Sequence, residues 1–491
     1  MQPTIETARK LAQGYSAVPI YKVLPETARD PLELFRVLKK LSRHCYLFES
    51  LEDPGQWGRY TFLGYDPTVE LTCTDGLLRI NNGSSIALET RDPGRYIEQL
   101  LADYASPQLP ELPPFTGGLV GYFSYDYCKY GEPLLDIDSN DQEGFKDVDL
   151  MLFDKVIAYD HREHRLFLIA TVRTDALDEN YHKALHELDA LARVVQDGEA
   201  QDVEPLKLLG GFEPLFTEDT YCAMIKRAKT YIHDGDIFQV VLSNRLVAPA
   251  QGSLFDTYRA LRDSNPSPYM FYFSSDDVEI AGASPETLAK LVDGQAFTFP
   301  LAGTRPRGAT PAEDAALEHD LLTDAKELAE HNMLVDLGRN DVGKVSRFGT
   351  VEVERYLDIL RFSHVMHIGS TVSGRIAADK TALDVIDAIL PAGTLSGAPK
   401  LRACQIIHEL EGNKRGIYGG AIGYLGFNGN MDTCIAIRLA FKKNGKIFVR
   451  SGAGIVADSV PANEYAECRN KIQAVINALH AAEGGYEVSA S

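Results

Sequence analysis

The chain has 491 residues, a length that allows two to four domains or one large body of helices and strands. Hydrophobic residues make up 45% of the chain, which is enough for a substantial core. The formal net charge of −21 argues against a nucleic acid or an anionic membrane surface as a partner. An anionic substrate remains compatible with it, because a metal ion or a few arginines can reverse the field locally.

Cysteine usage and apolar runs indicate the compartment. Seven cysteines are scattered along the chain without a Cys-x-x-Cys motif, which suits free thiols in a reducing cytoplasm. The first residues, Met-Gln-Pro-Thr-Ile-Glu, lack the basic and apolar regions of a signal peptide. No apolar run approaches the length of a membrane span. We therefore expect a soluble, cytoplasmic protein with no membrane contact.

Short strands are expected to dominate the first part of the chain. Residues 1–40 look helical at both ends around a loop at 18–31. Pro, Gly and Asp then separate short apolar runs, as in an antiparallel sheet. The expected elements are strands at 45–49, 58–64, 69–74 and 76–80, a helix at 92–104, a strand at 117–125, a hairpin of 150–159 with 165–172, and a helix at 178–195.

The acidic segment 196–204 is poor in apolar residues and places a domain boundary near residues 196–215. We expect one region over residues 1–205 and a second over 215–491. The second begins with a helix at 218–233, and its strands and helices do not alternate strictly. This order favours an α+β fold with large antiparallel sheets packed with helices over a doubly wound parallel sheet.

Two expected helices each carry two glutamates. Apolar residues recur at helical spacing within 321–341, and a later helix has Ser459 as a plausible N-cap with Pro461 in its first turn. The glutamates are three residues apart and share a face in each helix: Glu327 with Glu330, and Glu464 with Glu467. Together the helices could close on one Mg²⁺, which prefers oxygen ligands. The alternative is two solvated helix faces.

Two glycine-containing loops do not match nucleotide-binding patterns. Residues 393–400 have the wrong spacing for a phosphate loop, and residues 451–455 lack the third glycine of a dinucleotide fingerprint. Both loops can still bring backbone N–H groups close to an anion. Arg438, at the end of an apolar strand, is either an edge-strand charge or a bidentate partner for a carboxylate.

Taken together, these stretches resemble the chorismate-utilising enzymes, and most closely component I of the anthranilate synthases. The matching phrases lie between residues 218 and 485 and include Ala283-Ser-Pro-Glu286, Pro300-Leu-Ala-Gly-Thr-Arg305, Asp324-Ala-Lys-Glu-Leu-Ala-Glu-His331, Leu390-Pro-Ala-Gly-Thr-Leu-Ser-Gly-Ala-Pro-Lys400, Gly416-Ile-Tyr-Gly-Gly-Ala-Ile-Gly-Tyr424, Ile435-Ala-Ile-Arg438 and Glu464-Tyr-Ala-Glu-Cys-Arg-Asn-Lys471. The resemblance implies the family's fold, with residues 215–491 as a chorismate-binding catalytic domain and residues 1–205 as an N-terminal regulatory region.

The resemblance also implies a reaction, in which chorismate and ammonia give anthranilate and pyruvate in tryptophan biosynthesis. Glu286 is the expected acid for the C4 hydroxyl that leaves, and His367 is the candidate for pyruvate elimination. Mg²⁺ would be bound directly or through water by four glutamates: Glu330, Glu467, Glu327 and Glu464. The enolpyruvyl carboxylate would be held, and its pocket lined, by Tyr418, Arg438, Gly452, Gly454, Thr394 and Lys471.

Two positions separate this chain from other members of the family. Members that add water, such as isochorismate synthases, resemble one another in a lysine where this chain has Gln239. Aminodeoxychorismate synthases carry a lysine where this chain has Ala302. The absence of both lysines implies direct attack by ammonia. The alternatives are another chorismate enzyme, for example an aminodeoxyisochorismate synthase, and a catalytically silent tryptophan sensor.

A feedback site and a partner are implied as well. The phrase Tyr46-Leu-Phe-Glu-Ser50 resembles one wall of the family's tryptophan site, with Glu49 for the ammonium and Ser50 for a hydrogen bond. Pro268, Tyr269 and Met270 resemble the other wall, so inhibition by L-tryptophan is expected. No Gly-x-Cys-x-Gly elbow is present, so ammonia would come from a separate glutamine amidotransferase subunit or from free ammonium.

Overall fold

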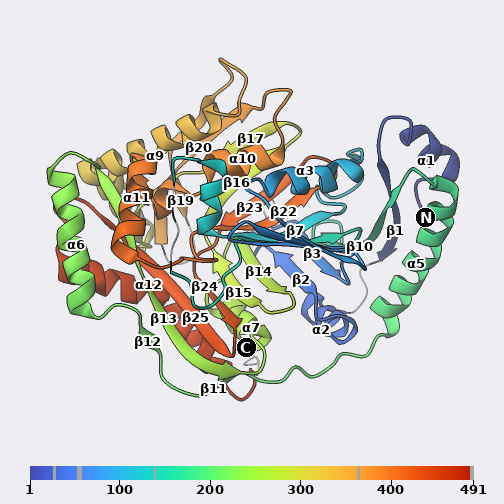
Figure 1. The fold of residues 1–491 in the computed structure, drawn as a ribbon, viewed down its shortest axis with the longest axis horizontal. Helices are drawn as coiled ribbons and strands as arrows, with labels where there is room; N and C mark the ends of the chain where they lie inside the picture. Colours follow the sequence, from blue (N-terminus) through green and yellow to red (C-terminus); the bar gives the residue numbers. More distant parts are fainter. Residues whose placement is uncertain (26–28, 52–57, 136, 138–139, 362–364, 487–491) are drawn as a thin grey trace.

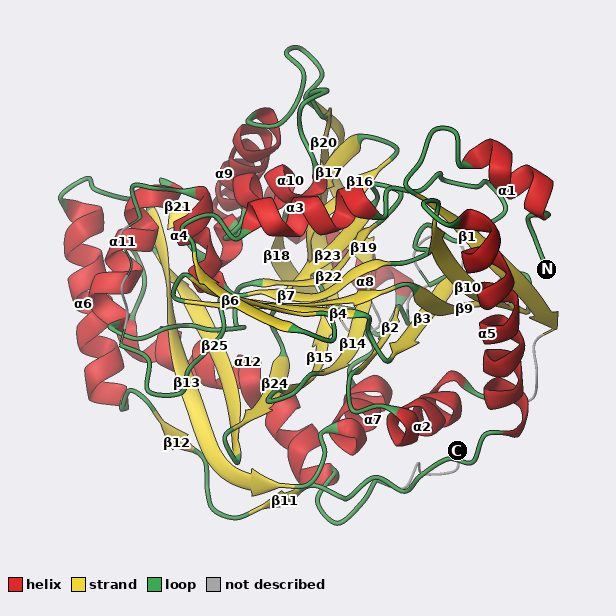
Figure 2. Cartoon of the chain, turned by 45° about the vertical axis from the view of Figure 1, so that its right-hand side comes forward, coloured by secondary structure: helices red, strands yellow, loops and turns green. Residues whose placement is uncertain are grey.

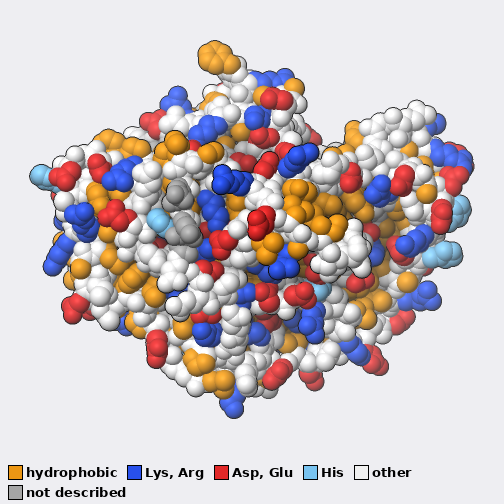
Figure 3. Space-filling model, in the orientation of Figure 1, with side chains coloured by type: hydrophobic (Ala, Val, Ile, Leu, Met, Phe, Trp, Pro, Cys, Tyr) orange, Lys and Arg blue, Asp and Glu red, His pale blue; other side chains and the backbone are white. Residues whose placement is uncertain are grey.

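The computed structural model describes residues 1–25, 29–51, 58–135, 137, 140–361 and 365–486. It consists of two large antiparallel sheets with helices on their outer faces (Figures 1 and 2), which confirms the expected α+β class. Acidic and basic side chains are interspersed over the face drawn in Figure 3, so on this face the net charge of −21 is not gathered in one patch.

One sheet has thirteen strands. Their order is β1 (Ala17–Pro25), β10 (Arg165–Arg173), β9 (Lys155–Asp160), β3 (Tyr60–Tyr65), β2 (Cys45–Glu49), β14 (Tyr269–Ser274), β15 (Glu279–Ser284), β24 (Leu439–Lys443), β25 (Lys446–Ile455), β13 (Gln239–Gln251) and β11 (Lys207–Leu208), with β12 (Glu213–Pro214) and β21 (Gly397–Ala398) also paired to β13.

The other sheet has twelve strands. Their order is β18 (Leu301–Pro306), β20 (Val365–Arg375), β17 (Gln295–Thr298), β16 (Thr287–Val292), β23 (Met431–Ile435), β22 (Ala421–Gly426), β7 (Gly118–Phe123), β8 (Val148–Phe153), β4 (Val69–Thr74), β5 (Leu77–Asn81) and β6 (Ser85–Glu89), with β19 (Glu352–Arg361) paired to β20.

Helices cover both sheets. They are α1 (Ile5–Leu11), α2 (Pro31–Leu41), α3 (Gly94–Asp103), α4 (Cys128–Gly131), α5 (Leu177–Asp197), α6 (Glu218–His233), α7 (Phe255–Ser264), α8 (Pro311–Thr323), α9 (Ala325–Gly343), α10 (Ala382–Ile389), α11 (Lys400–Glu411) and α12 (Pro461–Ala481). Within the described residues, no helix is long and apolar enough to cross a membrane.

Buried side chains show how the layers pack. A cluster that contains Tyr46, Phe273 and Tyr424 joins β2 and β14 of one sheet to β22 of the other. On strand β2, Leu47 points the opposite way from Tyr46, into a second cluster with helices α2, α5, α7 and α12. This alternation follows from the period of two in a strand, and it lets one strand contribute to the core between the sheets and to the helix layer.

Several expected element boundaries were wrong. The loop expected at 18–31 contains β1, an edge strand that pairs with all of β10; an edge strand tolerates its prolines, which had suggested a loop. Residues 150–159 are two strands, because the chain leaves β8 at Asp154 and enters the other sheet as β9. The helix expected at 321–341 breaks at Asp324, whose side chain caps α9.

The position of the expected domain boundary, 196–215, stays a prediction. Both sheets combine strands from the two sides of that segment, since β2 pairs with β14 and β7 pairs with β22. At one place in the structure, two connections run from one sheet to the other. Residues 285–286 connect β15 to β16, and residues 436–438 connect β23 to β24.

Candidate active site

Glu286 lies in the crossover from β15 to β16. Its side chain is partly exposed, and the surrounding protein raises the pKa of its carboxyl to about 7 by desolvation. Thr394 Oγ1 donates to Glu286 Oε1 at 3.0 Å, and the positive charges of Arg438 and Lys471 also oppose that rise. A carboxyl with this pKa can give up or accept a proton at neutral pH.

The sequence had suggested that Arg438 ends an apolar strand. It lies instead in the second crossover. It has a φ of 51°, a conformation that non-glycine residues rarely adopt, and its carbonyl accepts from the N–H of Ala283 at 3.1 Å. Its side chain is exposed, yet nearby protein lowers the pKa of the guanidinium and Glu286 opposes that shift. The two crossovers therefore place an acid beside a permanent cation.

His367, on β20, approaches the same place from another strand. Its Nδ1 lies 2.8 Å from the carbonyl oxygen of Gly303 and 3.1 Å from Thr304 Oγ1. A carbonyl oxygen can only accept, so Nδ1 carries the hydrogen and Nε2 is the basic nitrogen. Burial lowers the pKa of the imidazole, and Arg438 lowers it further. A neutral His367 is therefore suited to accept a proton.

Two glycines of β25 form a backbone wall. A Cβ at Gly452 would lie 2.6 Å from the carbonyl oxygen of Leu242 and 3.1 Å from the Tyr418 hydroxyl. A Cβ at Gly454 would lie 2.8 Å from Nε2 of Gln239. Only residues without a Cβ allow Tyr418 and Gln239 to pack this closely against the strand.

Lys471 extends this wall from helix α12. Its Nζ donates to the carbonyl oxygen of Gly452 at 3.2 Å and pairs with Glu467 at 2.7 Å. Ser459 is not the N-cap of this helix, because α12 begins after Val460 and the Ser459 hydroxyl accepts from the N–H of Val456 at 3.1 Å.

The glutamate pairs lie on two helices that face each other. Burial raises the pKa of Glu330 on α9, and the negative charges of Glu327 and Glu467 raise it further. Glu467 belongs to α12, so its effect on the pKa of Glu330 indicates that the two helices meet at one site. This excess of carboxylates fits a hard divalent cation.

Two of these carboxylates already have cationic partners. Glu327 pairs with Arg305 at 3.3 Å and Glu467 with Lys471. No three of the four glutamates have ligand atoms within 4.8 Å of one another. Among the described residues, the group that meets this distance consists of His44, Glu70 and Asp276. Glu464 lies partly exposed in the first turn of α12, and its role stays a prediction.

A buried charge network, missed in the sequence, supports the substrate-side elements. Arg415 donates to the carbonyl oxygens of Leu395 at 2.6 Å and Val241 at 2.7 Å, and pairs with Glu411 at 2.6 Å. Arg450 pairs with the other oxygen of Glu411 at 2.6 Å. The network fixes the turn next to Thr394 against β13. The network could not be predicted from the sequence, because the same charged residues are typical of a solvated loop.

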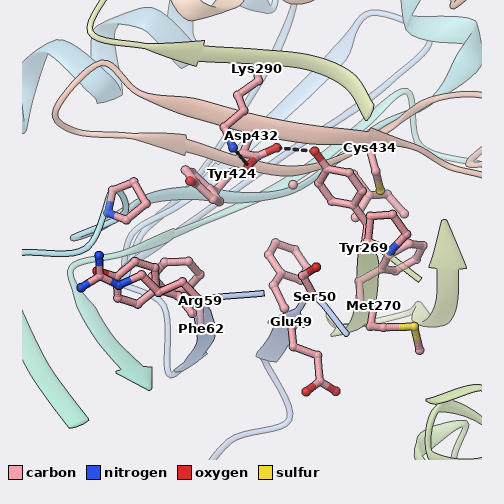
Figure 4. A pocket seen from close by; sticks show the side chains of 17 residues that line it. Glu49, Ser50, Arg59, Phe62, Tyr269, Met270, Lys290, Tyr424, Asp432 and Cys434 are labelled. Atoms are coloured by element: carbon pink, nitrogen blue, oxygen red, sulfur yellow. Dashed lines mark hydrogen bonds and ion pairs between the residues drawn. The ribbon is translucent and has the colours of Figure 1, made fainter. Parts of the chain in front are cut away.

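The expected tryptophan-site residues line a separate cavity of about 260 Å³ between the sheets. All five contribute to it: Glu49, Ser50, Pro268, Tyr269 and Met270. In Figure 4 the Glu49 carboxylate points away from the other labelled side chains. It accepts a hydrogen bond from the hydroxyl of Tyr258 and forms an ion pair with Arg262 at 2.8 Å. Its charge is therefore already neutralised.

Other charged groups of this cavity were not anticipated from the sequence. Lys290 pairs with Asp432 at 3.1 Å, and the Tyr269 hydroxyl donates to Asp432 at 2.8 Å (Figure 4). Ser50 Oγ is buried and has no hydrogen-bond partner among the described residues. The cavity thus combines aromatic walls with an ion pair and an unpaired hydroxyl, a lining that suits a zwitterion with an aromatic ring.

The fold and this constellation define a chorismate binding enzyme: residues 43–477 match that family, and the chain belongs to it. Along nearly its whole length it is similar to proteins named anthranilate synthase component 1. The protein of Acetivibrio thermocellus is 43% identical, over 98% of this chain and 99% of that one. The protein of Acinetobacter calcoaceticus is 44% identical, over 96% and 97%.

Solved structures agree with this fold. Anthranilate synthase component I from Streptococcus pneumoniae matches with a TM-score of 0.73 and 38% identity, over 85% of this chain and 92% of that chain. MenF, the menaquinone-specific isochorismate synthase from Escherichia coli, matches with a TM-score of 0.69 and 20% identity, over 97% and 98%. At that identity the second match supports the fold alone.

Proposed function

We propose that the chain is the large subunit of an anthranilate synthase, which converts chorismate and ammonia to anthranilate, pyruvate and water. The observation that carries this proposal is the placement of Gln239 beside Gly454, at the backbone wall of the site. An amide cannot act as the base that a lysine provides in water-adding members of the family. Ala302 likewise supplies no nucleophile in place of the lysine of aminodeoxychorismate synthases.

Different residues of the site act in the two halves of the reaction. Ammonia forms a bond to C2 of chorismate while the C4 hydroxyl leaves as water, with its proton from Glu286. His367 then accepts the C2 proton as the C3–O bond breaks, which makes the ring aromatic, and the released enolpyruvate takes up a proton at its methylene carbon to become pyruvate. Arg438 and Tyr418 hold the enolpyruvyl carboxylate against the backbone of Gly452.

We also propose that Glu330 and Glu467 bind Mg²⁺, with Glu327 and Glu464 as direct or water-mediated ligands. The raised pKa of Glu330 beside two further carboxylates supports this assignment. A bound Mg²⁺ supplies Lewis acidity and neutralises the ring carboxylate of chorismate. Arg305 and Lys471 offset part of the mutual repulsion of the carboxylates until the cation binds.

The regulatory ligand we propose for the cavity between the sheets is L-tryptophan. Its indole would pack against Pro268, Met270 and the aromatic walls, and its charged groups would meet Asp432, Lys290 and Ser50. Residues 1–205 then have a regulatory role, because Glu49 and Ser50 belong to them. Because the Glu49 carboxylate is already paired with Arg262, we propose that Asp432 and not Glu49 takes the ammonium of the ligand.

We further propose a glutamine amidotransferase subunit as the source of ammonia and the cytoplasm as the compartment. The names of the relatives as component 1 support a second component. Seven free cysteines, six of them buried, support a reducing environment.

The test is the fluorescence of anthranilate formed by the purified chain with chorismate, Mg²⁺ and ammonium at neutral and at alkaline pH, with and without L-tryptophan. We expect anthranilate and an equal amount of pyruvate. Consumption of chorismate without pyruvate would point to an isochorismate, aminodeoxychorismate or aminodeoxyisochorismate synthase. No consumption, even with an amidotransferase subunit and glutamine added, would favour a silent tryptophan sensor.

A further inference from the structure

The cavity between the sheets and the catalytic acid are joined by a short chain of hydrogen bonds. Tyr269 lines the cavity, and its hydroxyl lies 2.8 Å from Thr287 Oγ1 as well as from Asp432 Oδ1. Thr287 is the residue after Glu286 and does not line the cavity. One side chain therefore touches both the ligand cavity and the side chain of the residue that directly follows the acid.

The direction of these hydrogen bonds follows from the groups involved. The Asp432 carboxylate can only accept, so the Tyr269 hydroxyl donates its one hydrogen to it. The Thr287 hydroxyl must then donate to the Tyr269 oxygen. Asp432 also pairs with Lys290, which lines the cavity. A zwitterionic ligand that competes for Asp432 or Lys290 would thereby reorient the acceptor on which Thr287 depends.

The crossover is held firmly on its other sides. The N–H of Ile435 donates to the carbonyl oxygen of Glu286 at 2.9 Å, and Ser284 Oγ donates to the carbonyl oxygen of Ile435 at 2.7 Å. Thr287 pairs with Cys434 on β23, and the register shifts directly after it. Since Thr287 directly follows Glu286 in the chain, a displacement at Thr287 would act on Glu286 and on its hydrogen bond with Thr394.

We propose that the Tyr269–Thr287 hydrogen bond is the link through which a ligand in the cavity displaces the crossover at Glu286 and thereby weakens the binding of chorismate. Tyr269 and Thr287 are positioning residues in this scheme, since neither meets the reacting atoms. The inference rests on the proposed function, because it takes L-tryptophan as the ligand and chorismate as the substrate. An allosteric effect of this kind requires that each ligand alter the affinity for the other by the same factor.

The test measures that factor by calorimetric titration of the full chain with L-tryptophan, with and without chorismate and Mg²⁺, in the absence of ammonia. Thr287→Val removes the donor while keeping the shape, and Tyr269→Phe removes the acceptor. Tyr272→Phe is the matched control, since Tyr272 lies on the same strand and its hydroxyl bonds Glu279 instead. Thermal melts establish that each variant folds.

In the unmodified chain and in Tyr272→Phe we expect chorismate to weaken tryptophan binding by about 5- to 150-fold, the usual range of such coupling. In Thr287→Val and Tyr269→Phe we expect the factor to fall close to one, with tryptophan affinity alone little changed in Thr287→Val. Retention of the full factor in Thr287→Val overturns the link, as does its loss in Tyr272→Phe. No tryptophan binding by the unmodified chain would instead reject the proposed regulatory ligand, and the link with it.

Discussion

The backbone N–H of Ile435 donates to the carbonyl oxygen of Glu286 at 2.9 Å, and this bond ties the first sheet crossover to the strand that leads into the second. Glu286 follows β15 and Ile435 ends β23, so two strands that reach the site from different directions hold each other in place. The acid and the nearby Arg438 are thus fixed by backbone as well as by side chains, an arrangement that lowers the cost of orienting them during the reaction.

The acid role of Glu286 predicts an alkaline limb in the pH profile of kcat/KM. Its pKa of about 7 means that the protonated form is lost as pH rises through that value. The Thr394 hydrogen bond lowers this pKa, so Thr394→Val should raise it and move the limb to higher pH. Glu286→Gln should reduce kcat by about 10²- to 10⁴-fold, as expected for loss of a general acid. A limb that stays in place in Thr394→Val would argue against Glu286 as the titrating group.

The glutamate assignment predicts metal affinities that can be measured without turnover. Glu330→Gln and Glu467→Gln should each weaken Mg²⁺ binding, measured by calorimetry, by at least about 10-fold, since each removes a charged oxygen ligand. Glu352→Gln, at an exposed position on β19, is the control and should leave the affinity unchanged. Circular dichroism should show the same fold in all three. Unchanged affinity in both site variants would reject the assignment.

The two glycines of the backbone wall should respond differently to alanine. In Gly452→Ala the new methyl meets a backbone carbonyl oxygen at 2.6 Å, which cannot move easily, so we expect a loss of about 1–3 kcal/mol in urea unfolding. In Gly454→Ala it meets the flexible end of Gln239. That variant should fold normally and show a raised KM for chorismate. When Gln239→Ala is added, the KM for chorismate should fall part of the way back. No such fall would show that the backbone wall does not line the chorismate site.

The buried Arg415 should contribute far more to stability than Arg402, a partly exposed arginine on the neighbouring helix α11. Arg415→Met leaves Glu411 with one cationic partner in the interior, so we expect a loss of about 3–5 kcal/mol in the free energy of unfolding. Arg402→Met removes a half-exposed pair with Asp236 and should cost about 0–1 kcal/mol. Urea unfolding of both variants compares them, and equal losses would show that the network is not what stabilises the region.

Local patterns predicted many elements well. The structure confirms the expected bounds of α6, β2 and β4, where turn residues and N-caps mark the ends clearly. The break in the helix at Asp324 was missed, because the apolar spacing continues through it. The side chain of Asp324 nevertheless accepts from the N–H groups of Lys326 and Glu327, which starts a new helix. A cap inside a periodic segment is a weak signal.

The site was harder to predict than the elements. Resemblance named Glu286 and Arg438 as candidates, but the sequence does not show that both lie where the chain changes sheets, since that depends on pairing between distant strands. Arg415 and Asp432 gave no signal, because a charge that is buried in the fold looks like a solvated charge in the sequence. The orientation of the Glu49 carboxylate depends on Arg262, more than two hundred residues away in the chain.

The interleaving of strands from the two halves of the chain limits how the protein can be divided. A fragment that began after residue 215 would lack β2 and β7, the partners of β14 and β22. Two unpaired strand edges would then face solvent, each a template for pairing with another chain. We expect such a fragment to self-associate and not to act as a deregulated enzyme. Release from the proposed feedback by L-tryptophan should therefore arise from point substitutions, because deletion of residues 1–205 would also remove strands that belong to both sheets.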